Sequence, residues 1–184
     1  MELIKQIELK VKEVDDLNLW NSHIRLVRDY AIKLAKLENE DVETMEIAAI
    51  LHDYGRLKYG GKDHPMTGGE LALKILQMYK YPEEKVQKIV LAIKQHGSKE
   101  QEIPDFSKIL RAADAMSRLE TYPYLIALYM EKDMTFKYAV EKTIKKLENN
   151  WDYKIKSLGS ARAMSLTMQH QAMRILKINL SLVK

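Results

Sequence analysis

The chain has 184 residues, of which 46% are hydrophobic and 30% are charged, and its formal net charge is +4. This length predicts one domain, or one domain with a helical extension. The absence of cysteine excludes disulfides and thiolate metal sites. The opening segment MELIKQIELKVKE has no signal-peptide core, and no apolar run reaches the roughly 18 residues that a membrane span needs. We therefore expect a soluble, cytoplasmic protein without a membrane partner, whose small positive charge fits an anionic ligand but gives no strong indication of nucleic-acid binding.

Helical periodicity dominates the first half of the chain, and no sustained alternation or hairpin turn favours strands. The first helix is predicted by an apolar stripe of Trp20, Ile24, Val27, Ala31 and Leu34. Asp41 is expected to cap a second helix that ends at Gly55. Pro65 suits the first turn of a third helix, which continues through Met78. These helices predict an all-α fold.

The second half continues the pattern. Pro82 begins a helix that ends at Gly97, and Asp105 is expected to cap the next helix before Pro123 breaks the chain. Another apolar stripe predicts a helix with Phe136, Val140, Ile144, Leu147 and Trp151. A last helix is predicted from about residue 160 to 178. We expect a helical core over residues 1–124 and a helical extension over residues 125–184 that packs on it.

Several ionisable side chains fall on the apolar faces of these helices. They are His23, His52, His96 and Asp114. Burial of a charge is costly unless the group is paired or bound to a metal ion. Neutral imidazoles and a carboxylate that converge inside a helical bundle are typical of a metal site.

Each of these residues also has a simpler explanation. A single histidine on an apolar face is usually a core residue with one hydrogen bond. Asp114 can pair with Arg111 or Arg118, and His64 can be an ordinary loop residue. His170 has no acidic partner nearby in sequence and is taken as structural. The joint pattern favours a metal site, because four of the five histidines precede residue 100 on separate elements and two aspartates complete the set.

The order and spacing of these residues resemble the HD-domain superfamily of metal-dependent phosphohydrolases. The resemblance covers about residues 20–120 and lies in the segments HIRLVRDYAIKLA, AAILHDYGR, HPMTGGELALKIL, IVLAIKQHG and ILRAADAMSRLE. It implies an HD-type all-α helical bundle. The two histidines beyond the central His-Asp pair are similar to those of the two-metal branch, which includes diadenosine tetraphosphatases and cyclic-dinucleotide phosphodiesterases.

By this resemblance, two divalent transition-metal ions (iron, manganese or zinc) are expected as cofactors. Their implied ligands are His23, His52, Asp53 and Asp114 for the first ion, and Asp53, His64 and His96 for the second. Asp53 would bridge the two ions. One departure is Arg56, where many two-metal relatives have lysine. Arginine can still donate two parallel hydrogen bonds to a phosphate group.

The cations near this pattern suggest how a phosphate would be held. Arg56 is expected in a loop that follows Gly55 and covers the metals, and Arg111 and Arg118 lie on the helical face of Asp114. Arg56 and Arg118 are the predicted substrate-binding residues. Lys58 and Lys62 are expected to be solvated surface residues.

These predictions point to a metal-dependent phosphohydrolase, either a phosphomonoesterase or a phosphodiesterase, whose partner is a nucleotide or another small phosphate ester. The nucleophile would be a water between the metals, and Asp53 would position it as the catalytic bridging ligand. Two alternatives stay open: a di-iron oxygenase of the same superfamily, and a regulatory domain that binds metal and nucleotide without turnover. The sequence does not identify the substrate or the native metal. It also leaves open whether the chain forms a homo-oligomer.

Overall fold

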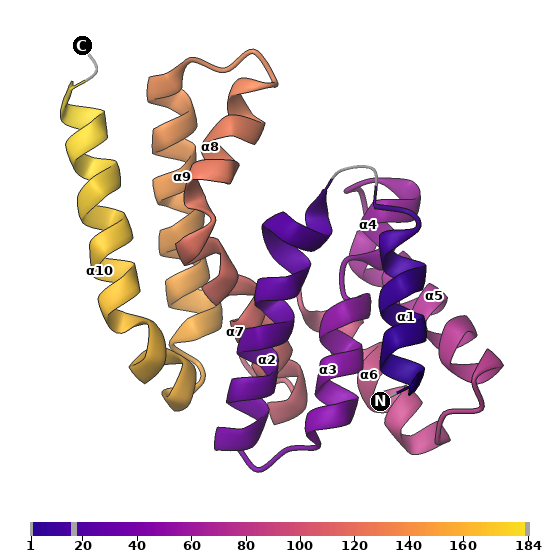
Figure 1. Ribbon diagram of the computed structural model, residues 1–184. Helices are drawn as coiled ribbons and strands as arrows, with labels where there is room; N and C mark the ends of the chain where they lie inside the picture. Colours follow the sequence, from indigo (N-terminus) through magenta and orange to yellow (C-terminus); the bar gives the residue numbers. More distant parts are fainter. Residues whose placement is uncertain (1, 16–17, 183–184) are drawn as a thin grey trace.

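The computed structural model describes residues 2–15 and 18–182, and every regular element in these ranges is helical (Figure 1). The elements are α1 (Glu2–Lys12), the π-helical turn η1 (Trp20–Ile24), α2 (Arg25–Leu37), α3 (Val42–Leu51), α4 (Tyr54–Tyr59), α5 (His64–Met78), α6 (Glu83–Gln95), α7 (Asp105–Glu120), α8 (Tyr122–Met130), α9 (Phe136–Asn150), the π-helical turn η2 (Trp151–Ile155) and α10 (Gly159–Leu182). The predicted all-α fold is confirmed. None of these helices combines the length and the hydropathy that a membrane span requires.

The helices form two neighbouring groups that share α7. Figure 1 shows α8, α9 and α10 together on one side and α1 to α6 on the other, with α7 between them. α7 packs against α2 and α6 in one group and against α9 and α10 in the other. One continuous core of buried side chains includes Leu34 and Ile109 as well as Val140 and Leu176. The helices after residue 124 thus share this core up to residue 182, while the predicted division into a core and an extension stays a prediction.

Gly55 does not end the second predicted helix. Asp41 caps α3 as expected, and its carboxylate accepts a hydrogen bond from the Thr44 backbone N–H at 3.1 Å. However, α3 ends at Leu51, and Gly55 lies inside the short helix α4. A Cβ atom at Gly55 would lie 2.5 Å from backbone atoms of Gly68 and His64. The glycine is thus required because α4 approaches the backbone of α5 closely, not because a helix stops there.

Three later expectations also need correction. Asp105 is the first residue of α7, not its cap, and its carboxylate contacts Lys108 at 2.7 Å. Pro123 lies in the first turn of α8, where its missing N–H costs nothing, so it begins a helix that was not predicted. In the stripe of α9, Val140 and Leu147 are buried but Phe136 is exposed, because the helix begins at that residue, away from the core.

We expect Asp41→Ala to lower the free energy of unfolding by about 1 kcal/mol, the usual contribution of an N-cap side chain. Burial raises the pKa of Asp41, but hydrogen bonds from Lys85 and Thr44 outweigh it and lower the pKa to about 2. This stabilisation is therefore present above the unfolded-state pKa, about 3.9, and is lost as the pH falls toward the folded-state value. Urea unfolding at pH 7 and at pH 3 measures both effects. Asp105→Ala is the control, because its exposed ion pair with Lys108 should contribute less than about 1 kcal/mol. Equal losses in the two variants would contradict the capping role of Asp41.

Candidate metal centre

Six separate positions in the fold bring the predicted ligands together. His23 lies in η1, His52 directly follows α3, and Asp53 precedes α4. His64 begins α5, His96 directly follows α6, and Asp114 lies within α7. Successive imidazole rings have centroids 5.2 to 5.3 Å apart, in the order His23, His52, His96 and His64. Every ligand implied by the resemblance therefore reaches one place, although His64 starts a helix and does not lie in a loop.

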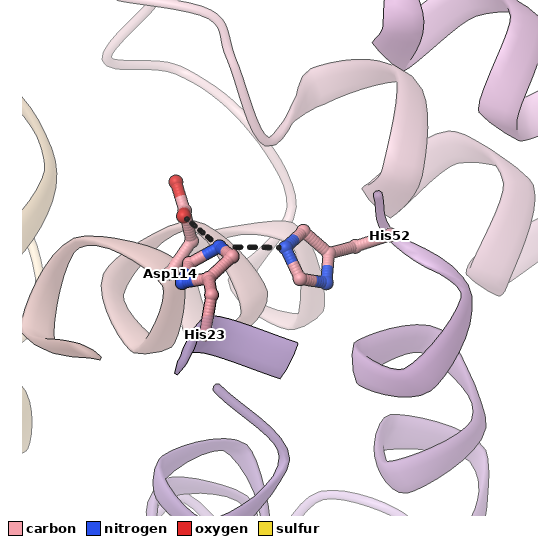
Figure 2. Close-up of side chains that lie close together, drawn as sticks. All are labelled: His23, His52 and Asp114. Atoms are coloured by element: carbon pink, nitrogen blue, oxygen red, sulfur yellow. Dashed lines mark hydrogen bonds and ion pairs between the residues drawn. The ribbon is translucent and has the colours of Figure 1, made fainter. Parts of the chain in front are cut away.

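The side chains divide into two groups that could each hold a metal ion. In each group, one ligand atom from every member lies within 4.8 Å of the others, and the groups are His23, His52 and Asp114, and Asp53, His64 and His96. Figure 2 shows the first group, in which His23 Nε2 lies 3.2 Å from His52 Nε2 and 3.2 Å from Asp114 Oδ1. The second group lies beside it along the row of rings.

Asp53 connects the two groups through its two carboxylate oxygens. Oδ2 lies 3.6 Å from His23 Nε2 and 3.7 Å from His52 Nε2. Oδ1 lies 3.2 Å from His64 Nε2 and 3.9 Å from His96 Nε2. The side chain is buried, and Oδ1 accepts no hydrogen bond. A carboxylate with each oxygen turned to a different histidine group has the arrangement of a bridging ligand.

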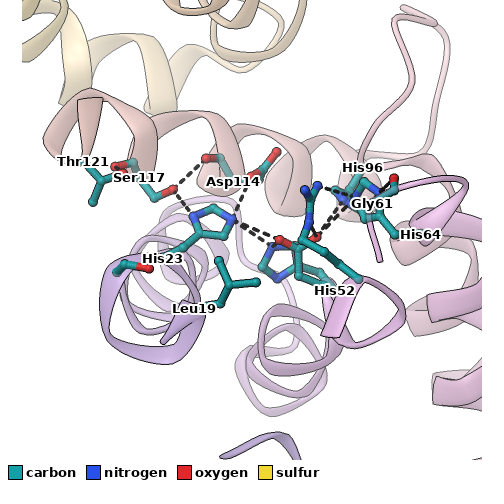
Figure 3. Close-up of polar contacts among 12 residues, drawn as sticks. Leu19, His23, His52, Gly61, His64, His96, Asp114, Ser117 and Thr121 are labelled. Atoms are coloured by element: carbon teal, nitrogen blue, oxygen red, sulfur yellow. Dashed lines mark hydrogen bonds and ion pairs between the residues drawn. The ribbon is translucent and has the colours of Figure 1, made fainter. Parts of the chain in front are cut away.

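The hydrogen bonds on the far sides of the rings fix which nitrogen faces the site. Nδ1 of His52 donates to the Ala49 carbonyl at 2.7 Å, and Nδ1 of His96 donates to the Ile93 carbonyl at 2.6 Å. His64 Nδ1 donates to the Gly61 carbonyl at 3.0 Å (Figure 3). In every case the lone pair of Nε2 is left for the site, as in histidines that ligate a metal.

His23 is held in the same way by a side chain. Its Nδ1 lies 2.9 Å from the Ser117 hydroxyl, which itself donates to the Asp114 carbonyl at 2.8 Å (Figure 3). The hydroxyl thus accepts the Nδ1 proton, and Nε2 of His23 faces Nε2 of His52, lone pair to lone pair, at 3.2 Å. Two such lone pairs repel unless a cation lies near both, so the donor set fits a bound metal ion.

Burial lowers the pKa of two of the imidazoles, while nearby cationic and hydrogen-bonding groups keep the carboxylates ionised. Burial and the nearby charge of Arg118 lower the pKa of His23 to about 3, and burial with His52 lowers that of His96 to about 4. Burial opposes ionisation of Asp114, but Lys154 and His23 hold the pKa of its carboxyl well below the usual range. At neutral pH, His23, His96 and Asp114 are therefore in the protonation states that bind metal.

Lys154 is a site residue that the sequence analysis missed. Its ammonium lies 2.9 Å from Oδ2 of Asp114, while Oδ1 of the same carboxylate faces His23. The ion pairs of Asp114 are thus with Lys154 and His23, and not with Arg111 or Arg118 as in the simpler explanation of this residue. His23 and Lys154 come from the two π-helical turns, η1 and η2, and such turns often carry functional side chains. No sequence signal marked Lys154, because it follows the segments that carry the motifs.

Of the three arginines considered, two line the pocket. Arg56 lies in α4, not in a loop, and its Nη2 donates to His64 Nε2 at 2.9 Å. Arg118 also lines the pocket. Arg111 does not, because it is fully buried and donates instead to the Glu100 carbonyl and to Ser157 Oγ. Arg111 was not among the predicted substrate-binding residues, and the structure gives its guanidinium other partners.

The remaining candidates lie outside the site. Lys58, Lys62 and His170 are exposed and do not line the pocket, which agrees with the surface positions expected of the two lysines, while the structural role of His170 stays a prediction.

The pocket in front of the metal groups has a volume of about 460 Å³. Its carboxylates, among the described residues, are Asp53 and Asp114. Its described cations are Arg56, Lys99, Arg118, Lys132, Lys146 and Lys154. Leu125, Leu128 and Tyr129 of α8 add an apolar wall. The C-terminal helices therefore build part of the pocket, and its charge favours an anionic ligand.

Comparisons with known proteins agree with this architecture. An uncharacterised protein of Clostridium beijerinckii is 37% identical over 79 residues, which make up 42% of this chain and 49% of that protein. The chain thus spans about half the length of this relative. A crystal structure of a predicted HD superfamily hydrolase from an uncultured Thermotogales bacterium superposes with a TM-score of 0.57 at 24% identity, covering 87% of this chain and 91% of that one. This likeness shows the shared fold. The family model of the HD domain matches residues 21–119, which are more than half of the chain. This segment supplies all six histidines and aspartates of the two metal groups. The protein therefore belongs to the HD domain family.

Proposed function

We propose that the protein is a metal-dependent phosphohydrolase that acts on a nucleotide or another small phosphate ester. The observation that carries this proposal is the position of Asp53, whose two oxygens face two separate histidine groups. We assign His23, His52, Asp53 and Asp114 to one divalent ion, and Asp53, His64 and His96 to a second. Imidazole and carboxylate ligands suit iron, manganese or zinc.

Two bound divalent ions supply a water of lowered pKa and neutralise charge that develops on a phosphate. The chain contributes the geometry around them. The four imidazoles present Nε2 in fixed orientations, and Asp53 is placed to accept a hydrogen bond from the attacking water as well as to bridge. Because Asp53 and His52 are almost fully buried, bulk water reaches the reacting atoms only through the pocket. This exclusion strengthens the electrostatic interactions within the site.

The pocket also supports a phosphorylated substrate. Arg56 and Arg118 line it next to the two metal groups, and both carry the planar group that binds phosphate oxygens in pairs. The described lining has no carboxylate apart from Asp53 and Asp114, so nothing there would repel an anion once metals neutralise these two groups. The apolar wall from α8 suits the uncharged part of a nucleotide.

We expect the metal-loaded protein to release phosphate or a nucleotide from at least one phosphate ester, under strictly anaerobic conditions as well as in air. A panel of nucleotides and aryl phosphates, assayed after reconstitution with iron, manganese or zinc, measures this. Oxygen uptake that depends on the substrate, with no hydrolysis, would favour the di-iron oxygenase instead. Tight nucleotide binding without any product would favour a regulatory domain.

A further inference from the structure

One face of α9 presents two polar side chains to the pocket. Lys146 and Asn150 lie one helical turn apart and both line it. Asn150 is only 3% exposed, and its side-chain Nδ2 has no hydrogen-bond partner. Nearly all buried polar groups in folded proteins are paired, so this free donor requires an explanation. An acceptor oxygen of a bound ligand would supply the missing partner.

Lys146 also lacks an ion-pair partner among the described residues. In the part of the chain that the structure describes, no carboxylate lies within 4.0 Å of its ammonium. The side chain is exposed at the rim, yet the surrounding protein and the charge of Lys154 lower its pKa. Arg118 and Arg56 lower it further, while Asp114 raises it. Lys146 lines the same pocket as Asp53 and Asp114, and these three other cations also line it. A bound anion would therefore reduce the repulsion among these positive charges.

We propose that Lys146 and Asn150 form a second anion subsite, which takes a phosphate group of the substrate other than the one held at the metal centre. This inference rests on the proposed function and narrows it to substrates with at least two phosphate groups. The pocket volume of about 460 Å³ lies within the roughly 300–1,000 Å³ that accommodates a whole small ligand. Lys146 and Asn150 lie outside residues 21–119, so this subsite belongs to the C-terminal helices and not to the part matched by the family.

The test uses ligands that cannot be hydrolysed. Linear alkane bisphosphonates with three to six methylene groups are compared with alkyl monophosphonates of the same lengths, by calorimetric titration of the metal-loaded protein. At least one bisphosphonate is expected to bind about tenfold tighter than its monophosphonate, the gain expected of one hydrogen bond to a charged group. Lys146→Ala should remove most of this advantage and leave monophosphonate binding within about twofold.

Lys145→Ala is the matched control, because Lys145 is exposed on the same helix and does not line the pocket. It should keep the full bisphosphonate advantage. Equal losses in the two lysine variants, or no advantage at any chain length in the unmodified protein, would overturn the subsite. If the advantage depends on Lys146 but no phosphate ester is ever hydrolysed, the subsite stands and the hydrolase proposal fails. Asn150→Leu, which keeps the branched shape of the side chain but removes its amide, should reduce the same advantage in a protein whose melting temperature shows that it is folded.

Discussion

Asp53→Asn is expected to lose both metal ions and to reduce hydrolysis roughly a thousandfold, the upper range for removal of one preorganised polar group from an active site. The reason is that the two oxygens of Asp53 serve two groups, since Oδ2 lies 3.6 Å from His23 Nε2 and Oδ1 lies 3.2 Å from His64 Nε2. An amide keeps the shape of the side chain, but it removes the negative charge that both groups share and replaces one of the oxygens with a nitrogen that does not bind metal. Elemental analysis by mass spectrometry and steady-state kinetics on the same samples measure the two effects.

His64→Ala is the matched comparison for this prediction. It should lose one ion and keep the other, because the first group retains His23, His52 and Asp114 together with Asp53. If the Asp53 and His64 variants lose the same amount of metal, the division into two sites is wrong. A metal content that never exceeds one ion per chain in the unmodified protein would contradict the second site altogether.

Much of the metal centre could be predicted because its residues interrupt apolar faces of helices. His23 and His96 lie on stripes whose other members are buried, and the structure buries both histidines with them. A polar side chain on such a face must find a partner, so a helical pattern alone reveals that several of these groups converge. The resemblance to the HD-domain superfamily then added Asp53 and His64 and implied the division of the six candidates into two groups.

The features that the sequence analysis missed or misinterpreted depend on contacts between segments that are distant in sequence. Gly55 was interpreted as a helix end because glycine commonly follows one, whereas its actual constraint is the close approach of α4 to α5. Arg111 lies on the same helix as Asp114, yet the packing of η2 and the segment after α6 gives it other partners. Lys154 reaches Asp114 across 40 positions of sequence, and no local period encodes that contact.

The C-terminal helices carry no motif of their own, and they were expected to act in stability, in assembly or as a lid over the site. In the structure, Lys154 contacts a predicted metal ligand, and Tyr129, Lys146 and Asn150 line the same pocket. The HD domain family accounts for the metal groups, which lie within residues 21–119. The walls that meet the rest of a substrate come largely from helices after that segment, so they are where the specificity of this protein should be sought.

Arg56→Ala is expected to lower phosphate-ester hydrolysis roughly a hundredfold, as for loss of one donor to a developing charge, while both metal ions remain bound. In the structure the guanidinium lies between the second metal group and the pocket, with Nε 3.2 Å from Asp53 Oδ1 and Nη2 2.9 Å from His64 Nε2. It thus covers the lone pair that a metal ion would need. A bound ion would displace Arg56 from His64 toward the pocket, where a phosphate oxygen would lie. Removal of the side chain should therefore leave the affinity for the second ion unchanged or improved.

Two further variants separate this role from a structural one. Arg56→Lys should recover part of the activity, because the charge returns without the paired donors of arginine. Lys58→Ala is the control, since Lys58 lies in the same helix but is exposed and does not line the pocket, so its loss should change turnover by less than about twofold. Kinetics with metal content measured in each sample decide the question. If Arg56→Ala loses the second ion along with its activity, Arg56 supports the metal group and does not bind the phosphate.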